Sequence, residues 1–227
     1  MTSTGWRGDL AIATLTGVLL LLWDFSGLDL PVARLFANAQ GFALREHWFT
    51  RSVLHEGGRV LSWSVLLLLI VNLRWPLLWR LPLRTRVWWL LATLLCALLV
   101  PALKQISATS CPWDLAEFGG VARYVSHWRW GLADGGGGRC FPSGHATAAF
   151  ALMSGYFALR ETQPRAARAW LNAVLLLGLA FGWGQLARGA HYPSHTLWSG
   201  WLCWVLCSAA HALAGPWLQP QTRGIAR

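Results

Sequence analysis

Residues 87–103 read VWWLLATLLCALLVPAL, an apolar stretch without a charged side chain. A helix needs roughly 17–25 such residues to cross a bilayer, so the stretch predicts a transmembrane span. Further apolar runs stand at 10–23, 60–71, 146–159, 169–186 and 196–217. Several runs are short, and we expect flanking residues to complete them; the second would extend through Leu73 to Trp79 with Arg74 snorkelling to the interface. The pattern predicts an all-α bundle of six transmembrane helices.

The composition indicates the same class of protein. Hydrophobic residues make up 55% of the 227 residues and charged residues 12%, whereas soluble domains carry about 25% charge. We expect one integral membrane domain over residues 1–227, because a bilayer can solvate apolar surface that a single soluble core could not bury. The net charge of +10 comes from arginines spread over short loops. Without a contiguous basic patch, the sequence argues against nucleic acid as a partner.

The loop arginines set the predicted orientation. Short loops at 74–86 and 160–168 are rich in Arg, which is typical of cytoplasmic loops. Both termini are then cytoplasmic, and the longer segments 24–59 and 104–145 lie on the outer face, the periplasmic face of a bacterial-type inner membrane. We expect residues 24–59 to form short amphipathic helices on this face. Within them, His55-Glu56-Gly57-Gly58 is interpreted as a helix end with a glycine stop, or alternatively as part of a substrate entrance.

The five cysteines divide by location. Cys111 and Cys140 both fall in the outer segment, and the outside of such a membrane is oxidising, so we predict a Cys111–Cys140 disulfide. Two free thiols, or a metal-binding pair with a nearby His, are the alternatives. Cys96, Cys203 and Cys207 lie in apolar runs and are interpreted as buried thiols.

Two clusters of polar residues border the outer segment. Lys104, the only lysine of the chain, ends the third apolar run, where it suits a phosphate oxygen or simply snorkels to the interface. The sequence Phe141-Pro142-Ser143-Gly144-His145 opens the fourth run. Backbone N–H groups at the start of a helix bind anions, and a His there can donate a proton to a leaving oxygen. A simple helix cap is the alternative interpretation.

A third cluster, RGAHYPSH at residues 188–195, lies at the junction of the fifth and sixth runs. Ionisable groups at a membrane boundary are candidates for function. By the predicted topology all three clusters lie outside, and together they suit phosphoryl transfer without a metal. One His would attack phosphorus and another would protonate the leaving group. The nonbridging oxygens would be held by Lys104, Arg188 and the amides of Ser143 and Gly144.

These clusters resemble the signature of the type-2 phosphatidic acid phosphatase superfamily, which also includes the vanadium haloperoxidases. Its pattern is K-x6-R-P, then P-S-G-H, then S-R-x5-H-x3-D, and the resemblance spans residues 104–195 and extends to the six-span topology. The resemblance implies a phosphate ligand at Lys104, an oxyanion cradle at Ser143 and Gly144, a general acid at His145 and a nucleophile at His191. It implies no metal and no other cofactor.

The chain departs from this pattern at three positions. Cys111 and Gln185 stand where the family has arginines, and His195 stands where it has the aspartate that orients the nucleophile. Arg188, one helical turn beyond Gln185, or Arg139, beside Cys140, is expected to replace the lost charge.

The lost aspartate needs a substitute as well. We expect Asp114 or Glu117, on the outer segment, to supply the carboxylate that His195 lacks. His191 and His195 also have the i, i+4 spacing of a zinc pair, but Pro193 stands between them and no H-E-x-x-H motif is present, so we do not expect a metal.

The resemblance implies a hydrolase acting on the phosphomonoester or diphosphate of an amphiphilic lipid through a phosphohistidine. The expected partners are the lipid phosphate and the membrane; neither the particular lipid nor the oligomeric state follows from the sequence. A lipid phosphotransferase that uses the same intermediate, and a non-catalytic phospholipid-binding relative, are the alternatives.

Overall fold

The computed structural model describes residues 4–38, 40–129 and 131–218, and it is a bundle of helices. Five of its helical segments are long and apolar enough to cross a membrane, and the predicted all-α membrane bundle is confirmed. Four of them correspond to α1 (Thr4–Ser26), α4 (Leu83–Gln105), α7 (Pro164–Ala187) and α8 (Pro193–Leu218). The fifth runs from Phe49 to Arg74.

The fourth predicted run forms a short, interrupted helix inside the bundle. It consists of α5 (Gly144–Phe150), the 3-10 turn η4 (Ala151–Met153) and α6 (Ser154–Leu159). This segment packs against α4, α7 and α8, and most of its side chains are buried. Gly178 of α7 permits the close approach, because a Cβ at this position would lie 2.1 Å from the Phe150 ring. Surrounded by protein, the segment does not need the length of a lipid-facing span.

The second span begins earlier than its sequence predicts. The π-helix η1 (Phe49–Gly57) continues directly into α3 (Gly58–Arg74), so the expected short surface helices over 24–59 are limited to α2 (Asp29–Arg34). The interpretation of His55–Gly58 as a helix end is wrong. Gly57 and Gly58 both have helical backbone angles, with φ −61° and ψ −38°. Gly58 permits close packing instead, since a Cβ there would lie 2.7 Å from Cζ of Phe181.

The same span also ends earlier than expected. α3 stops at Arg74, and Trp75 is extended at φ −118° and ψ 117°. Because Pro76 disfavours helical angles at the residue before it, the helix cannot continue to Trp79. The span is therefore completed on its N-terminal side, by η1, and not by the loop that follows it.

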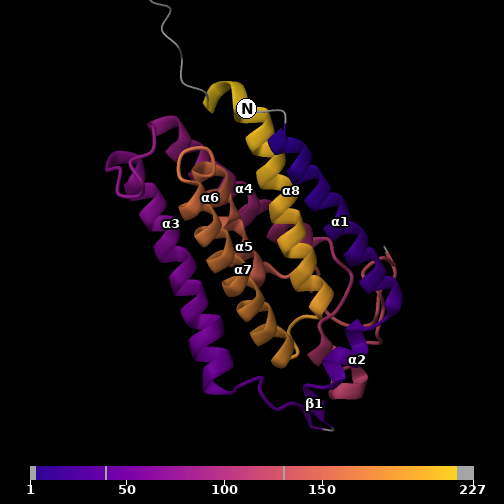
Figure 1. The fold of residues 1–227 in the computed structure, drawn as a ribbon. Coiled ribbons are helices and arrows are strands. Elements are labelled where there is room, and N and C mark those ends of the chain that lie inside the picture. Colours follow the sequence, from indigo (N-terminus) through magenta and orange to yellow (C-terminus); the bar gives the residue numbers. More distant parts are fainter. Residues whose placement is uncertain (1–3, 39, 130, 219–227) are drawn as a thin grey trace, which may run out of the picture.

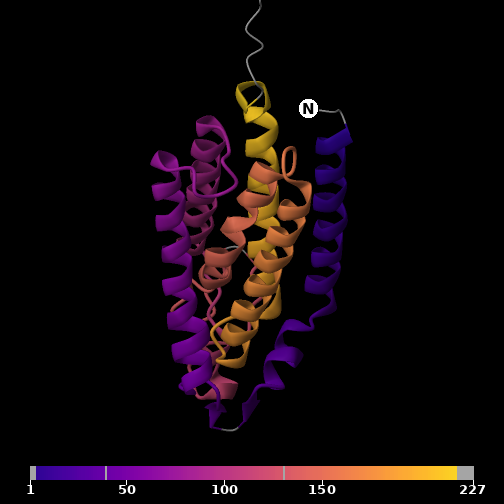
Figure 2. The ribbon, with the colours of Figure 1, turned by 60° about the vertical axis from the view of Figure 1, so that its left-hand side comes forward.

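The helices alternate in direction, which brings the polar loops together. α1 begins and α8 ends at one end of the bundle, whereas α2 and β1 (Ala37–Asn38) lie at the opposite end (Figures 1 and 2). β1 pairs with β2 (Gly41–Phe42) in an antiparallel hairpin. The loop between α4 and α5 contains the 3-10 turns η2 (Pro112–Asp114) and η3 (Ala116–Phe118).

Two buried carboxylates fix the start of α8. Asp29 accepts hydrogen bonds from Trp23 Nε1 at 2.9 Å, from the Ser194 amide at 3.0 Å and from the Ser194 hydroxyl. Asp24 accepts from the indoles of Trp128 and Trp198, each at 2.8 Å. These bonds join α1, α2 and the outer loop to the helix that carries His195.

Candidate active site

A cavity of about 660 Å³ lies between α3, α4 and α5. It brings together residues from all three sequence clusters: Lys104 at the end of α4, Gly144 and His145 at the start of α5, and His191 between α7 and α8. The structure shows no ion-pair or hydrogen-bond partner for the Lys104 ammonium among its described residues. A cation, two imidazoles and a helix start therefore face one space.

The turn before α5 is held against α8. Ser143 is fully buried, its amide donates to the His195 carbonyl at 3.1 Å, and the Ser199 hydroxyl donates to the Ser143 carbonyl at 2.9 Å. The Ser143 hydroxyl caps the helix by accepting from the Ala146 amide at 3.4 Å. Ser143 thus fixes the turn and does not line the cavity, whereas Gly144 does. Of the two amides expected to hold phosphate, the one at Ser143 is already bonded.

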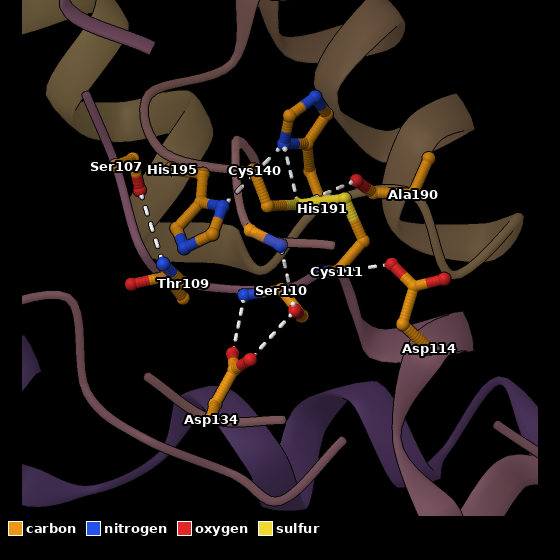
Figure 3. The surroundings of a disulfide bond; sticks show 11 residues. Ser107, Thr109, Ser110, Cys111, Asp114, Asp134, Cys140, Ala190, His191 and His195 are labelled. Carbon is orange, nitrogen blue, oxygen red and sulfur yellow. Dashed lines mark hydrogen bonds between the residues drawn. A yellow bond between two sulfur atoms is a disulfide. The ribbon is translucent and has the colours of Figure 1, made fainter. Parts of the chain in front are cut away.

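His191 and His195 form a buried pair. Their exposed fractions are 4% and 0%, and their Nδ1 atoms lie 3.4 Å apart (Figure 3). One Nδ1 must donate and the other accept, so each ring has a defined tautomer. A donating His191 Nδ1 leaves its Nε2 unprotonated. It also places the proton of His195 on Nε2, which is buried and has no hydrogen-bond partner in the described part of the chain.

Burial lowers the pKa of His191 well below its usual value, and the nearby Lys104 and His145 lower it further. A buried imidazolium would lose its hydration and would also face a second cation, so the neutral ring is favoured. A neutral imidazole has the lone pair that a nucleophile requires.

His145 is half-buried and is held by the helix η1. Its Nε2 lies 3.1 Å from the carbonyl oxygen of Leu54, and its ring stacks on that of His55 with centroids 4.7 Å apart. If Nε2–H donates to this carbonyl, Nδ1 is the nitrogen that remains for proton exchange.

A disulfide between Cys111 and Cys140 crosses the site, with Cα atoms 5.2 Å apart. It joins the chain that follows Lys104 to the turn that precedes α5, and Cys140 Sγ lies 3.6 Å from Nδ1 of His191 (Figure 3). Backbone bonds reinforce the connection: the Cys140 amide donates to Thr109, and the Trp113 amide donates to Gly189, each at 2.9 Å.

Asp134 organises the glycine-rich part of the same loop. Its carboxylate accepts from the Ser110 amide at 2.6 Å and from the Ser110 hydroxyl at 2.8 Å (Figure 3). Gly136 packs so closely that a Cβ there would lie 2.4 Å from the Ser110 hydroxyl oxygen. The loop is thus a packed support for the disulfide.

Neither expected replacement for the lost arginines lines the cavity. Arg188 Nε donates to the carbonyl of Arg45 at 2.9 Å, and Arg139 is exposed on the outer loop with a left-handed φ of 56°. Gln185 itself lines the cavity, and its Nε2 is buried without a hydrogen-bond acceptor among the described residues. The cavity wall thus contains the amide side chain of Gln185 and neither Arg139 nor Arg188.

The expected carboxylates also lie elsewhere. Asp114 accepts from the Cys111 amide of its own turn at 3.2 Å, and Glu117 forms an exposed ion pair with Arg34 at 2.8 Å. Asp24 lies near a third histidine, with an oxygen 3.4 Å from Nε2 of His127. The His127 ring in turn packs against that of His195, with centroids 5.7 Å apart. No carboxylate in the described ranges hydrogen-bonds His195 directly.

The helix formed by η1 and α3 contributes five cavity residues, of which the sequence pointed only to His55, as part of a substrate entrance. His55, Arg59 and Ser62 line the polar end, and Trp63 and Leu66 continue the wall toward the bilayer centre. The signal that would have found them is their helical spacing, which places positions 55, 59, 62 and 66 on one face.

The rest of the cavity is apolar. Its wall beyond the polar end is formed mainly by α4 and by the central segment of α5 and η4, with the side chains of Leu94, Ala97, Leu98, Pro101, Ala148, Ala151 and Leu152. Trp63 and Leu98 are 67% and 69% exposed, so the groove reaches the outer, lipid-facing surface of α3 and α4. The arrangement suits a ligand with an anionic head and an apolar chain.

Two groups of side chains approach each other at metal-ligand distances. In the first, Cys140, His191 and His195, the sulfur is part of the disulfide and offers no thiolate. In the second, Asp24, Asp29 and His127, both carboxylates already accept the indole and Ser194 hydrogen bonds. The donor chemistry of neither group fits a metal centre well.

Comparison with known protein families finds that the model of the PAP2 superfamily matches residues 85–217, more than half of the chain. The matched region includes Lys104, the turn before α5 and both histidines of the buried pair. No curated protein and no solved structure matches the chain.

Proposed function

Because the chain belongs to the PAP2 superfamily, whose members are generally phosphatases, we propose that it is a membrane lipid phosphatase. Its substrate is the phosphomonoester or diphosphate of an amphiphilic lipid. The observation that carries the proposal is the cavity, which unites Lys104, His145 and His191 at one end with an apolar groove at the other.

The reaction proceeds in two steps through His191. Nε2 of the neutral ring attacks phosphorus, and the bond from phosphorus to the leaving oxygen breaks while His145 gives that oxygen a proton. Burial lowers the pKa of His145 to about 4, so the ring takes up this proton when the bound phosphate anion lies beside it. Water then attacks the phosphohistidine, His145 takes a proton from the water, and the bond between nitrogen and phosphorus breaks to release phosphate. The residues that hold the nonbridging oxygens are Lys104, Gly144 and Gln185.

His195 is a positioning residue in this scheme. By accepting from Nδ1–H of His191 it selects the tautomer whose Nε2 is the nucleophile. The pocket needs no metal for these steps, since the charges that develop are met by Lys104 and by hydrogen-bond donors.

The site faces the outside of a bacterial-type inner membrane in this proposal, with both termini in the cytoplasm. A disulfide persists in an oxidising compartment, and Cys111–Cys140 lies at the active-site end of the bundle. The arginine-rich loops at 74–86 and 160–168 are at the other end, as cytoplasmic loops would be.

The experiment that tests the proposal measures phosphate release by the purified protein in detergent. The substrates are a panel of lipid monophosphates and diphosphates in the presence of EDTA, and the variants are His191→Ala and, as a control, His47→Ala on the exposed surface. We expect release by wild type and by the control, and loss in His191→Ala. Release only when an acceptor alcohol is added would identify a phosphotransferase, and binding without release would identify a non-catalytic relative.

A further inference from the structure

One face of the second transmembrane helix turns three polar side chains toward the candidate phosphate site. His55, Arg59 and Ser62 line the cavity that also contains Lys104 and His191. The same face continues into the apolar wall, at Trp63 and Leu66. The polar part of this helix face therefore lies where the anionic head of an amphiphilic ligand would be bound.

Arg59 is unpaired in the described part of the protein, where its guanidinium has neither an ion-pair nor a hydrogen-bond partner. Its neighbour Arg51, on the same helix, differs: its guanidinium pairs with Glu46 at 2.7 Å and with Glu56 at 3.6 Å. No Asp or Glu of the described residues lines the cavity, so the charge of Arg59 adds to that of Lys104 without being neutralised.

His55 connects this helix to the catalytic residues. Its ring stacks on His145 with centroids 4.7 Å apart and an interplanar angle of 28°, and the carbonyl of Leu54, the preceding residue, lies 3.1 Å from Nε2 of His145. The position of the helix is thus fixed relative to the residue that donates the proton. Arg59, one turn further along, is held at the same end of the cavity.

We propose that Arg59 is a phosphate-binding residue, and that it supplies from the second helix the positive charge that the family pattern places at Cys111 and Gln185. The inference rests on the proposed function and specifies its substrate-binding site. A phosphomonoester carries a charge of about −1.5 to −2 at neutral pH, which Lys104 alone does not balance. Lys104 and Arg59 together match a dianion, and His55 offers an additional hydrogen bond from the same helix face.

The test compares Arg59→Ala and Arg59→Lys with Arg51→Ala, a matched control on the same helix whose side chain lies outside the cavity. Two quantities are measured: the KM for the lipid phosphate, with the inhibition constant of inorganic phosphate, and the rise in Tm that inorganic phosphate produces. Loss of one charge-assisted contact weakens binding by about ten- to a hundredfold. We expect Arg59→Ala to raise KM and the inhibition constant by this factor, to lower kcat less, and to lose the phosphate-induced rise in Tm.

Arg59→Lys should recover part of the binding, and Arg51→Ala should resemble wild type. An Arg59→Ala variant that binds phosphate and substrate as wild type does would overturn the inference. If wild type released no phosphate from any lipid, the proposed function would fail, while the Tm measurement would still report whether Arg59 binds phosphate. Arg59→Gln, which keeps most of the side-chain length, replaces the alanine variant if that variant does not fold.

Discussion

Nδ1 of His195 lies 3.4 Å from Nδ1 of His191, in the place where the family pattern has a carboxylate. A neutral imidazole can fix the tautomer of its neighbour but cannot stabilise the positive charge that appears on His191 when phosphorus is attacked. In the proposed mechanism, the phosphohistidine should therefore form more slowly and break down faster than one supported by an aspartate.

We expect His195→Asp to speed the formation of the phosphohistidine and to slow its breakdown. A carboxylate would stabilise the phosphohistidine, so its formation should accelerate by about tenfold, the equivalent of one charge-assisted hydrogen bond, and the intermediate should accumulate. Rapid acid quenching with a radiolabelled substrate measures both steps. His195→Asn, which keeps a hydrogen-bond acceptor without the charge, is the control. Slower formation in the aspartate variant would contradict the argument.

Gln185→Glu should abolish substrate binding. Gln185 lines the cavity and its buried Nε2 has no acceptor among the described residues, so we expect it to donate to a phosphate oxygen, whereas a glutamate would repel the anion. Gln185→Ala removes one neutral hydrogen bond and should raise KM by about two- to tenfold. The two KM values, with circular dichroism as a check on folding, test the assignment; equal effects of both substitutions would exclude a phosphate contact.

Burial of His191 predicts a loss of stability in acid. Its pKa in the folded protein lies below the usual value of about 6.5, so as the pH falls below this value the unfolded chain binds a proton that the folded chain does not. Below a pH of about 6.5, the free energy of unfolding should decrease by up to about 1.4 kcal/mol for each pH unit of acidification. Above this pH neither state binds the proton, so His191 no longer makes the free energy of unfolding depend on pH.

Thermal denaturation in detergent between pH 5 and pH 8 measures the effect. We expect His191→Gln to have a flatter dependence of Tm on pH than wild type, and the exposed His47→Gln to have the dependence of wild type. Parallel curves for wild type and His191→Gln would show that burial of His191 does not contribute to the pH dependence.

Reduction of the disulfide should destabilise the protein and impair turnover. Closure of a loop by Cys111–Cys140, which are 29 residues apart, stabilises a fold by about 3–4 kcal/mol in the chain-entropy account. We expect the double Cys111→Ser, Cys140→Ser variant to have a lower Tm and lower kcat. A reductant should lower the Tm of wild type and leave that of the double variant unchanged. Alkylation before and after reduction counts the two thiols released.

Substitution of the adjacent Gly57 and Gly58 by alanine should have opposite effects on the stability of the fold. A Cβ at Gly58 would lie 2.7 Å from the Phe181 ring, whereas the nearest atom to one at Gly57 is the Ser52 carbonyl oxygen at 3.4 Å. Gly57→Ala should be neutral or stabilising, since alanine is favoured over glycine in a helix by about 1 kcal/mol. Gly58→Ala should cost about 1–3 kcal/mol through overpacking. A Tm measurement distinguishes them, and a stabilised Gly58→Ala would mean that Phe181 does not pack closely against this position.

The apolar part of the fold was predictable because each lipid-facing run has to be apolar over its length. The ends of the helices were not. The sequence FTRSVLHEG at 49–57 contains charged residues and reads as surface, but a helix that reaches the interface can keep polar side chains in water while its backbone bonds continue from α3. Only Pro76 was a local stop signal, and α3 ends two residues before it.

The site divides in the same way. The alternating helix directions put the helix ends that carry Lys104, His145 and His191 on one side of the membrane. Counting the apolar runs in the sequence is enough to predict this arrangement. The direction of the Arg188 side chain did not follow from the sequence, because its backbone is still helical while its guanidinium donates to the carbonyl of Arg45, which is far away in sequence. Asp114 was likewise unavailable, since its carboxylate bonds the backbone of its own turn.

The helix from Phe49 to Arg74 is the least buried of the five long helices, with 11% of its most apolar window inside the bundle. It lines the polar end of the cavity and the beginning of the apolar groove. The proposed nucleophile His191, its partner His195 and the disulfide all belong to other segments. Under the proposed function, changes at its apolar positions Trp63 and Leu66 would alter which lipid is recognised, whereas changes at Leu54, His55 or Arg59 would also disturb the polar end of the site. Over evolutionary time, substrate preference in such a protein is free to diverge by changes in the apolar half of one helix while the reaction itself is inherited intact.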